Sequence, residues 1–166
     1  SWSRSQTRSI ECNPEICQVY MLAERVVELY TLSAQEKHIT LRNDIPKHLY
    51  VYVDKEMIIT GFRNICNNAI KFTPLNGSVI FSAHEYSEYI EVSIRDTGLG
   101  ISAEDLQSLF VIKPSTSYKR KKMQGSGLGL IVSKEFIEKN NGTILVTSEI
   151  DKGSEFIIRL PKNSTL

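Results

Sequence analysis

Two asparagines and a lysine occur at a spacing that places them together on one helix face. Asn64, Asn68 and Lys71 are separated by four and then three positions, within a segment whose apolar residues recur with a helical period. Asparagine is a poor helix former, so two on one face lower the helix propensity of the segment. Neutral amide oxygens suit a hard cation such as Mg²⁺, and a neighbouring lysine suits phosphate oxygens. A solvated polar stripe has the same residue types, so this spacing leaves both interpretations open.

A carboxylate directly after a predicted strand is the second candidate for chemistry. Asp96 opens the stretch Asp96-Thr97-Gly98-Leu99-Gly100, where it can accept a hydrogen bond from the exocyclic amine of a nucleobase. The glycines let the backbone approach a ligand and reach positive φ. Ordinary turns and calcium loops share this composition. A calcium loop needs further acidic residues in register, however, and none follows.

A second glycine cluster lies directly before and within a predicted helix. Residues 125–130 read Gly-Ser-Gly-Leu-Gly-Leu, and the free N–H groups at such a helix start form a phosphate site. The cluster matches neither a dinucleotide-binding motif nor a P-loop, because the glycine spacing differs and no Walker lysine follows. A flexible hinge is an equal interpretation. The basic run at 119–122 is either a solvated loop face or part of a lid over an anion.

The composition is that of an ordinary globular domain. The chain has 166 residues, a formal net charge of +1 and 41% hydrophobic residues, so it can bury one core and has no overall field that would attract nucleic acid or acidic lipid. Its three cysteines, Cys12, Cys17 and Cys66, have no metal-ligand spacing, which favours reduced thiols. No apolar run approaches the ~20 residues of a membrane helix.

The apolar periodicity predicts helices and strand pairs that would position these residues. Asn13 with Pro14, and later Asp54, are the predicted helix starts. The predicted helices cover residues 14–36, 54–71, a short segment after Ser102, and 126–140, and the predicted strands cover 38–45, 49–53, 79–85, 89–95, 143–149 and 155–160. Strand pairs with short turns indicate an α+β fold, a two-layer sandwich with a mixed, mostly antiparallel sheet and helices on one face.

The order of these motifs resembles the ATP-binding catalytic domain of sensor histidine kinases, which has the Bergerat nucleotide-binding fold. Residues 64–73 resemble the N box of that family, residues 96–101 its first glycine box, and residues 125–130 its second glycine box. Phe110, after Leu109, resembles the F box. The resemblance covers about residues 14–162.

This resemblance implies ATP and Mg²⁺ as cofactors and suggests a role for each matched residue. Asn64 and Asn68 would hold Mg²⁺, and Lys71 would contact phosphate, so that Asn68 and Lys71 are the catalytic candidates. Phe72 would pack near the nucleotide and Asp96 would read the adenine amino group. The implied nucleotide-binding residues are Asn64, Asn68, Lys71, Phe72, Asp96, Gly98, Gly100, Ile101, Phe110, Gly125, Ser126, Gly127, Leu128, Gly129, Leu130 and, on the closing strand, Ser154.

The resemblance also implies a domain organisation and partners. Residues 1–12 would be the tail of an upstream helical dimerisation segment, and residues 13–166 the catalytic domain. His38, His48 and His84 fall in or beside predicted strands, so the phosphoacceptor histidine is expected on the upstream segment of a homodimeric parent protein. A response-regulator receiver domain would be the further partner. This domain itself is expected to be cytoplasmic and to contact neither nucleic acid nor membrane. The same expectation holds if the parent protein is anchored in the inner membrane.

One departure from related ATPases bears on the reaction. Those ATPases carry a glutamate general base early in the N-box helix, whereas here Asn64 occupies the corresponding position. Without that carboxylate nothing activates water, so phosphoryl transfer to an outside nucleophile fits better than hydrolysis. A regulatory nucleotide-binding module and an autonomous ATPase of the same fold are the alternatives.

Overall fold

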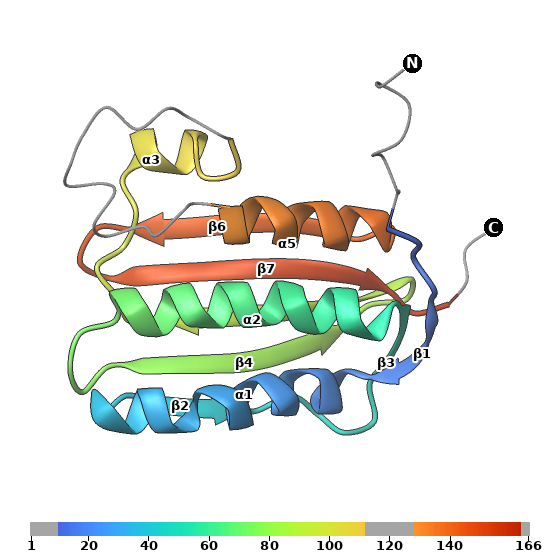
Figure 1. The fold of residues 1–166 in the computed structure, drawn as a ribbon, viewed down its shortest axis with the longest axis horizontal. Coiled ribbons are helices and arrows are strands. Elements are labelled where there is room, and N and C mark those ends of the chain that lie inside the picture. Colours follow the sequence, from blue (N-terminus) through green and yellow to red (C-terminus); the bar gives the residue numbers. More distant parts are fainter. Residues whose placement is uncertain (1–9, 112–127, 164–166) are drawn as a thin grey trace, which may run out of the picture.

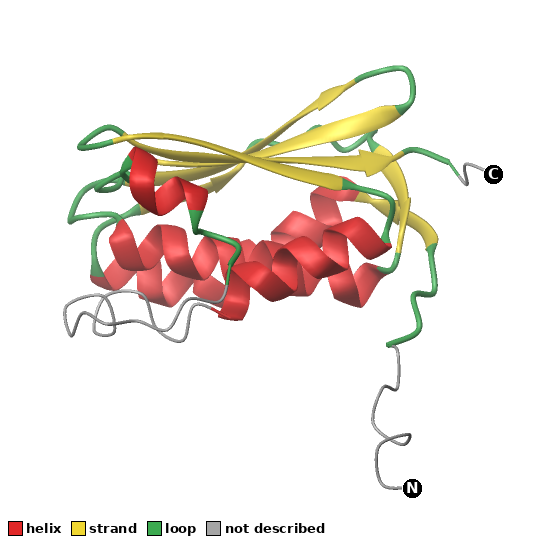
Figure 2. Cartoon of the chain, turned by 90° about the horizontal axis from the view of Figure 1, so that it is seen from above, coloured by secondary structure: helices red, strands yellow, loops and turns green. Residues whose placement is uncertain are grey.

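The structure, a computed structural model, describes residues 10–111 and 128–163. Within these residues a five-stranded sheet of order β2-β4-β5-β7-β6 carries helices on one face, and a separate two-stranded sheet joins β1 to β3 (Figures 1 and 2). The strands are β1 (Glu15–Gln18), β2 (Thr40–Asn43), β3 (Tyr50–Val53), β4 (Ser78–Glu85), β5 (Tyr89–Asp96), β6 (Thr143–Glu149) and β7 (Gly153–Pro161). The helices are α1 (Val19–Glu36), α2 (Lys55–Phe72), α3 (Ala103–Gln107) and α5 (Leu128–Lys139).

The large sheet is mixed, as predicted. β2 pairs with β4 in parallel, and all other pairs of this sheet are antiparallel. The predicted two-layer α+β sandwich is therefore confirmed. Of the predicted helix 126–140, the structure describes α5, which begins at Leu128. Residues 125–127 and the basic run 119–122 lie outside the described residues, as do residues 1–9 of the predicted upstream tail.

Helix α2 lies in the middle of the helical layer (Figure 1). It begins where the Asp54 side chain accepts a hydrogen bond from the backbone N–H of Met57, the N-cap expected from the sequence. Its fully buried residues include Ile58, Phe62 and Ile65, and the Phe62 ring meets that of Phe81 in β4 edge-on, 6.1 Å between centroids. The core thus fixes which face of α2 points away from the sheet.

The predicted helix start at Asn13 is wrong. Residues Glu15–Gln18 form strand β1, which pairs antiparallel with β3, and α1 begins only at Val19. Ile16 is 60% exposed while Cys17 and Val19 are buried, an alternation of strand type. Ile16 and Val19 also fit a helical period, so local pattern did not separate the two structures. The partner strand, more than thirty positions away, decided between them.

None of the helices in residues 10–111 and 128–163 has the length and hydropathy needed to cross a membrane.

Candidate functional site

Asp96 ends strand β5 with a buried carboxylate that keeps one oxygen available. The side chain belongs to a residue only 7% exposed, and its Oδ1 accepts hydrogen bonds from the backbone N–H groups of Gly98, at 2.8 Å, and Ser154, at 3.3 Å. Within the described residues, Oδ2 accepts none, and no buried side-chain oxygen or nitrogen there lacks a partner. Oδ2 therefore reaches the surface, where a ligand can donate to it.

The electrostatics of Asp96 agree with a site held for a ligand. Burial raises the pKa of the Asp96 carboxyl, and the N–H groups of Gly98 and Ser154 lower it in part. Among the described residues, no lysine, arginine or histidine forms a salt bridge with this carboxylate. A buried carboxylate without a cation lowers the stability of the fold, because it has lost its hydration. A ligand that donates a hydrogen bond to it offsets part of this desolvation cost.

The glycine turn after Asp96 is held between two other parts of the site. A Cβ on Gly98 would lie 2.7 Å from Asp96 Oδ1 and 2.9 Å from the backbone O of Phe72, too close for any other residue. Gly100 has φ of +74°, and a side chain there would collide with the backbone O of Glu149. The backbone N–H of Leu99 donates to the Phe72 carbonyl at 3.2 Å. The turn thus packs on the end of α2 and on the β6–β7 turn.

Helix α2 presents the predicted polar face between this turn and α5. Asn64 Nδ2 donates to the backbone O of Gly129 at 3.0 Å. Asn68 is half-buried and, within the described residues, its side chain makes no hydrogen bond, so its amide is free for a ligand. Lys71 is exposed, with its Nζ 5.6 Å from the centroid of the Phe72 ring. From Asn64 to Phe72 the face extends roughly 12 Å along the helix.

The donor atoms on α2 fit Mg²⁺ only together with an anionic ligand. In the described residues no group of three or more histidine, cysteine, aspartate or glutamate side chains can hold a metal ion. Mg²⁺ is commonly held by one or two protein oxygens plus phosphate oxygens and water. The Asn68 amide, together with the Oδ1 that Asn64 leaves uncommitted, supplies such a set, so the residues fit the metal as a partner of bound phosphate.

The start of α5 lies against α2. Ser133 Oγ donates to the backbone O of Gly129, at 2.8 Å, and lies 3.3 Å from the backbone O of Gly61 in α2. Leu130 is buried and Leu128 is 49% exposed. The structure therefore brings the described half of the second glycine cluster to the Asn64 end of α2. Gly125, Ser126 and Gly127 lie outside the described residues.

Phe110 lies beside α5 and does not contact the Asp96 turn through any described interaction. It follows α3 and packs against the core, and Lys134 Nζ lies 5.3 Å from its ring centroid. Ile101, by contrast, is tied to the Asp96 end, because its backbone N–H donates to Ser148 Oγ at 2.7 Å. The three histidines are exposed, as expected for surface residues.

Two functional candidates were missed from the sequence. Ser148 in β6 contacts both Ile101 and Ser154, and Lys37 Nζ donates to the backbone O atoms of Ile70, at 2.7 Å, and Lys71, at 3.3 Å. The contacts of Ser148 with Ile101 and of Lys37 with the end of α2 join positions more than thirty residues apart. A serine in a strand and a lysine after a helix give no local signal of such roles.

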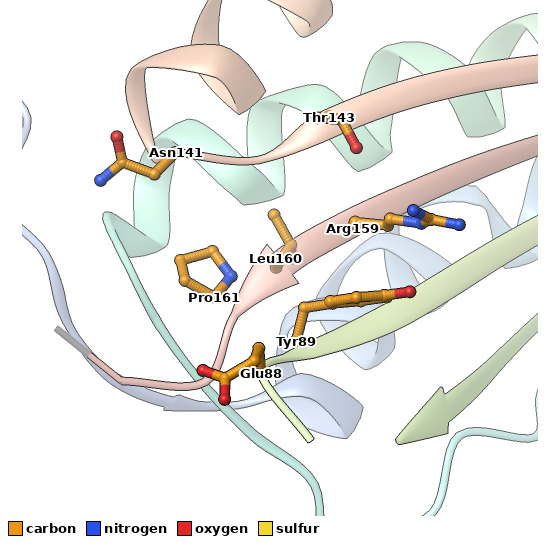
Figure 3. A pocket seen from close by; sticks show the side chains of 7 residues that line it. All are labelled: Glu88, Tyr89, Asn141, Thr143, Arg159, Leu160 and Pro161. Carbon is orange, nitrogen blue, oxygen red and sulfur yellow. The ribbon is translucent and has the colours of Figure 1, made fainter. Parts of the chain in front are cut away.

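A separate pocket of about 270 Å³ lies at the other end of the sheet. Figure 3 shows its lining side chains, with Arg159 beside the Tyr89 ring. Tyr89 begins β5 and Asp96 ends it, so the pocket is roughly 23 Å from the Asp96 carboxylate along the strand. The pocket contains none of the residues predicted for the site, and is lined by Glu88, Tyr89, Asn141, Thr143, Arg159, Leu160 and Pro161.

Comparisons with known proteins agree with this arrangement. Residues 53–164 match the family described as histidine kinase-, DNA gyrase B- and HSP90-like ATPases. The chain is 29% identical to the sensor histidine kinase WalK of Bacillus subtilis over 96% of its own length and 26% of that protein. It is 35% identical to the adaptive-response sensory kinase SasA of Synechocystis over 84% of the chain and 37% of that protein. The chain thus spans between about a quarter and somewhat over a third of the length of these relatives.

Solved structures share the fold over most of the chain. The catalytic domain of the histidine kinase ThkA is 24% identical, with a TM-score of 0.79, over 90% of this chain and 96% of that one. The histidine kinase AdeS of Acinetobacter baumannii is 26% identical, with a TM-score of 0.75, over 93% of this chain and 70% of that one. Full-length ShkA in complex with AMPPNP is 25% identical, with a TM-score of 0.79, over 94% of this chain and 32% of that one.

Proposed function

This chain belongs to the family of histidine kinase-, DNA gyrase B- and HSP90-like ATPases, and its relatives include sensor histidine kinases. We propose that it binds Mg·ATP and transfers the γ-phosphate to a histidine outside residues 1–166. The observation that carries the proposal is the Asp96 carboxylate, which is buried, pairs with no cation among the described residues and has Oδ2 open to a donor. The exocyclic amine of adenine is such a donor. The ShkA structure, in complex with AMPPNP, supports a nucleotide as the ligand.

The residues of α2 would act on the phosphate end of the bound nucleotide. Lys71 would place its charge beside phosphate oxygens, and the amides of Asn68 and Asn64 would hold Mg²⁺. When bound, Mg²⁺ supplies charge neutralisation for the transferred group. Since the rise along α2 separates Asn64 from Phe72 by roughly 12 Å, base and phosphates can lie along the same helix.

Transfer is favoured over hydrolysis because no general base stands at the start of the polar face. Asn64 has no carboxylate, and its Nδ2 is already bonded to Gly129. Arg63, the residue before it, is exposed and basic. Without a base at this position, the described residues of α2 would position ATP without activating water. A histidine brought by a dimerisation domain, in a homodimeric parent protein, supplies the nucleophile. A response-regulator receiver domain would then take up the phosphoryl group.

The test is reconstitution from two pieces. The domain is mixed with a separately purified histidine-bearing dimerisation domain and γ-labelled ATP, and the second protein is assayed for acid-labile, base-stable label. We expect label on the dimerisation domain and none after its histidine is replaced by glutamine. Nucleotide binding without transfer would indicate the regulatory module instead. Rapid phosphate release by the domain alone would indicate an autonomous ATPase.

A further inference from the structure

The hydroxyl of Ser148 joins three parts of the Asp96 end of the sheet. Its Oγ accepts from the backbone N–H of Ile101 at 2.7 Å, donates to the backbone O of Gly153 at 2.9 Å, and lies 2.8 Å from Ser154 Oγ. Ser148 and Ser154 are cross-strand partners in β6 and β7. Ser154 is also the partner of Asp96 across β5 and β7, so the three side chains form a row at this end.

Counting protons assigns a direction to the contact between the two serines. A hydroxyl has one proton and two acceptor sites. The Ser148 proton goes to the Gly153 carbonyl, which can only accept, and one of its acceptor sites goes to the Ile101 N–H. By distance alone either hydroxyl could donate across the contact between the two serines, and assigning the Ser148 proton to Gly153 makes Ser154 its donor. Ser154 Oγ is left with acceptor sites only.

We propose that Ser148 is a specificity-determining positioning residue, which holds the Ser154 hydroxyl proton away from the nucleobase so that the base meets acceptors only. The proposal rests on nucleotide binding at Asp96. Asp96 Oδ2 and Ser154 Oγ then present two acceptors at neighbouring positions. A 6-amino group, with two N–H donors, satisfies them. A 6-oxo group has no proton to donate, so its lone pairs would face those of Asp96 Oδ2 and Ser154 Oγ. These buried oxygens would then lack a donor, which strongly disfavours binding of a 6-oxo nucleotide.

The test compares ATP with ITP, which carries a 6-oxo group in place of the amine. Dissociation constants for both nucleotides are measured calorimetrically with the wild-type domain and the variant Ser148→Ala. In the variant the Ser154 proton loses its acceptor and can turn toward O6. We expect the ITP-to-ATP ratio of dissociation constants to fall about fivefold, the contribution of one neutral hydrogen bond.

A merely structural role for Ser148 would weaken both nucleotides in parallel, so the ratio is the decisive readout. Ser148→Thr, which keeps the hydroxyl, should retain the wild-type ratio. In a Ser154→Ala background Ser148→Ala should no longer change it, because no Ser154 proton remains. Thr147→Ala, at the neighbouring exposed position of β6, is the matched control and should leave both affinities unchanged.

An ITP-to-ATP ratio that stays unchanged in Ser148→Ala would overturn the inference. So would a fall of this ratio on Ser148→Ala that is as large in the Ser154→Ala background as in the wild-type domain. Circular dichroism and thermal unfolding check the fold of each variant. If Ser148→Ala does not fold, Ser148→Cys, which fills the site with a weaker acceptor, replaces it in the same cycle. A wild-type domain that binds neither nucleotide would instead refute the proposed function itself.

Discussion

Strand β5 carries two very different surfaces at its two ends. At the carboxyl end, Asp96 is buried, has no cation partner among the described residues and keeps one oxygen open. At the amino end, the pocket beside Tyr89 contains Arg159, whose Nε lies 3.1 Å from Glu91 Oε2 and whose guanidinium lies 4.8 Å from the centroid of the Tyr89 ring. One end has an uncompensated charge, and the other has its charge already neutralised.

This difference shows why a hollow in the surface is a weaker indication of function than a buried carboxylate with one oxygen open to a ligand. The Arg159 guanidinium would have to give up Glu91 or the Tyr89 ring to bind a ligand. Asp96 gives up nothing, because its backbone partners occupy only Oδ1. The buried carboxylate also lowers the stability of the empty domain, a penalty that natural sequences tend to keep only where function requires it.

Replacing the carboxylate at each end of β5 should give the largest contrast. Asp96→Ala removes the acceptor for the adenine amine, and we expect ATP affinity to fall at least tenfold, the scale of a hydrogen bond to a charged group. Glu91→Gln, at the other end of the strand, should leave affinity unchanged. Calorimetric titration measures both. Equal losses in the two variants would show that neither end is specific for the nucleotide.

The next effect concerns the metal. Asn68→Ala removes a free amide from the polar face of α2, so ATP affinity should fall about tenfold in Mg²⁺ and much less in EDTA. Asn67→Ala is the matched control, since Asn67 is exposed and about 100° further round the helix. The affinities are measured by displacement of a fluorescent nucleotide. The same loss with and without Mg²⁺ would contradict the metal assignment.

A smaller effect on stability and on ATP binding is expected at Lys37, which contacts the C-terminal end of α2. Lys37 Nζ donates to the backbone carbonyls of Ile70 and Lys71, in the last turn of the helix. Its positive charge also stabilises the negative, C-terminal end of the helix dipole. Lys37→Met keeps the aliphatic stem but loses the charge, so we expect a loss of about 1 kcal/mol in unfolding free energy and a severalfold weaker binding of ATP. Lys37→Arg should recover much of both. The control Lys47→Met, at an exposed lysine whose Nζ lies 5.0 Å from the centroid of the Tyr20 ring, should leave ATP affinity unchanged.

The smallest effect is on the pH dependence of stability. Burial raises the pKa of Asp96 above its ordinary 3.8, so ionising this carboxyl costs more in the folded chain than in the unfolded chain. The free energy of unfolding therefore falls as pH rises from the ordinary pKa through the raised one. Asp96→Asn removes that loss. Thermal unfolding should therefore show the variant as the more stable at neutral pH, with the difference shrinking below the ordinary carboxyl pKa. A difference that grows in acid would contradict this sign.

The sequence was sufficient for the parts of the site that depend on local signals. Helix α2 has its Asp54 cap, a regular apolar period and a stop at Thr73-Pro74, so its bounds were predicted within a residue. Asp96 and its glycines follow an alternating strand directly. The burial of Asp96 and its bond to the backbone N–H of Ser154 were not predicted, because strand pairing brings these two distant residues together.

Contacts between distant positions could not be predicted. Strand β1 forms because β3 offers it an edge, and its sequence alone fits a helix equally well. The same holds for Ser148 and Lys37, whose partners lie on other elements. For Gly125, Ser126 and Gly127 the prediction stays a prediction, because they lie outside the described residues.

The most direct test of the central claim, that the nucleotide base binds at the Asp96 end of β5, is an NMR titration of the ¹⁵N-labelled domain with ATP and Mg²⁺. We expect the largest backbone amide shifts at Gly98, Ile101 and Ser154, whose N–H groups bond Asp96 or Ser148. Tyr89 and Arg159 should stay unperturbed. The largest shifts at Tyr89 and Arg159, with Gly98 and Ser154 unmoved, would contradict it.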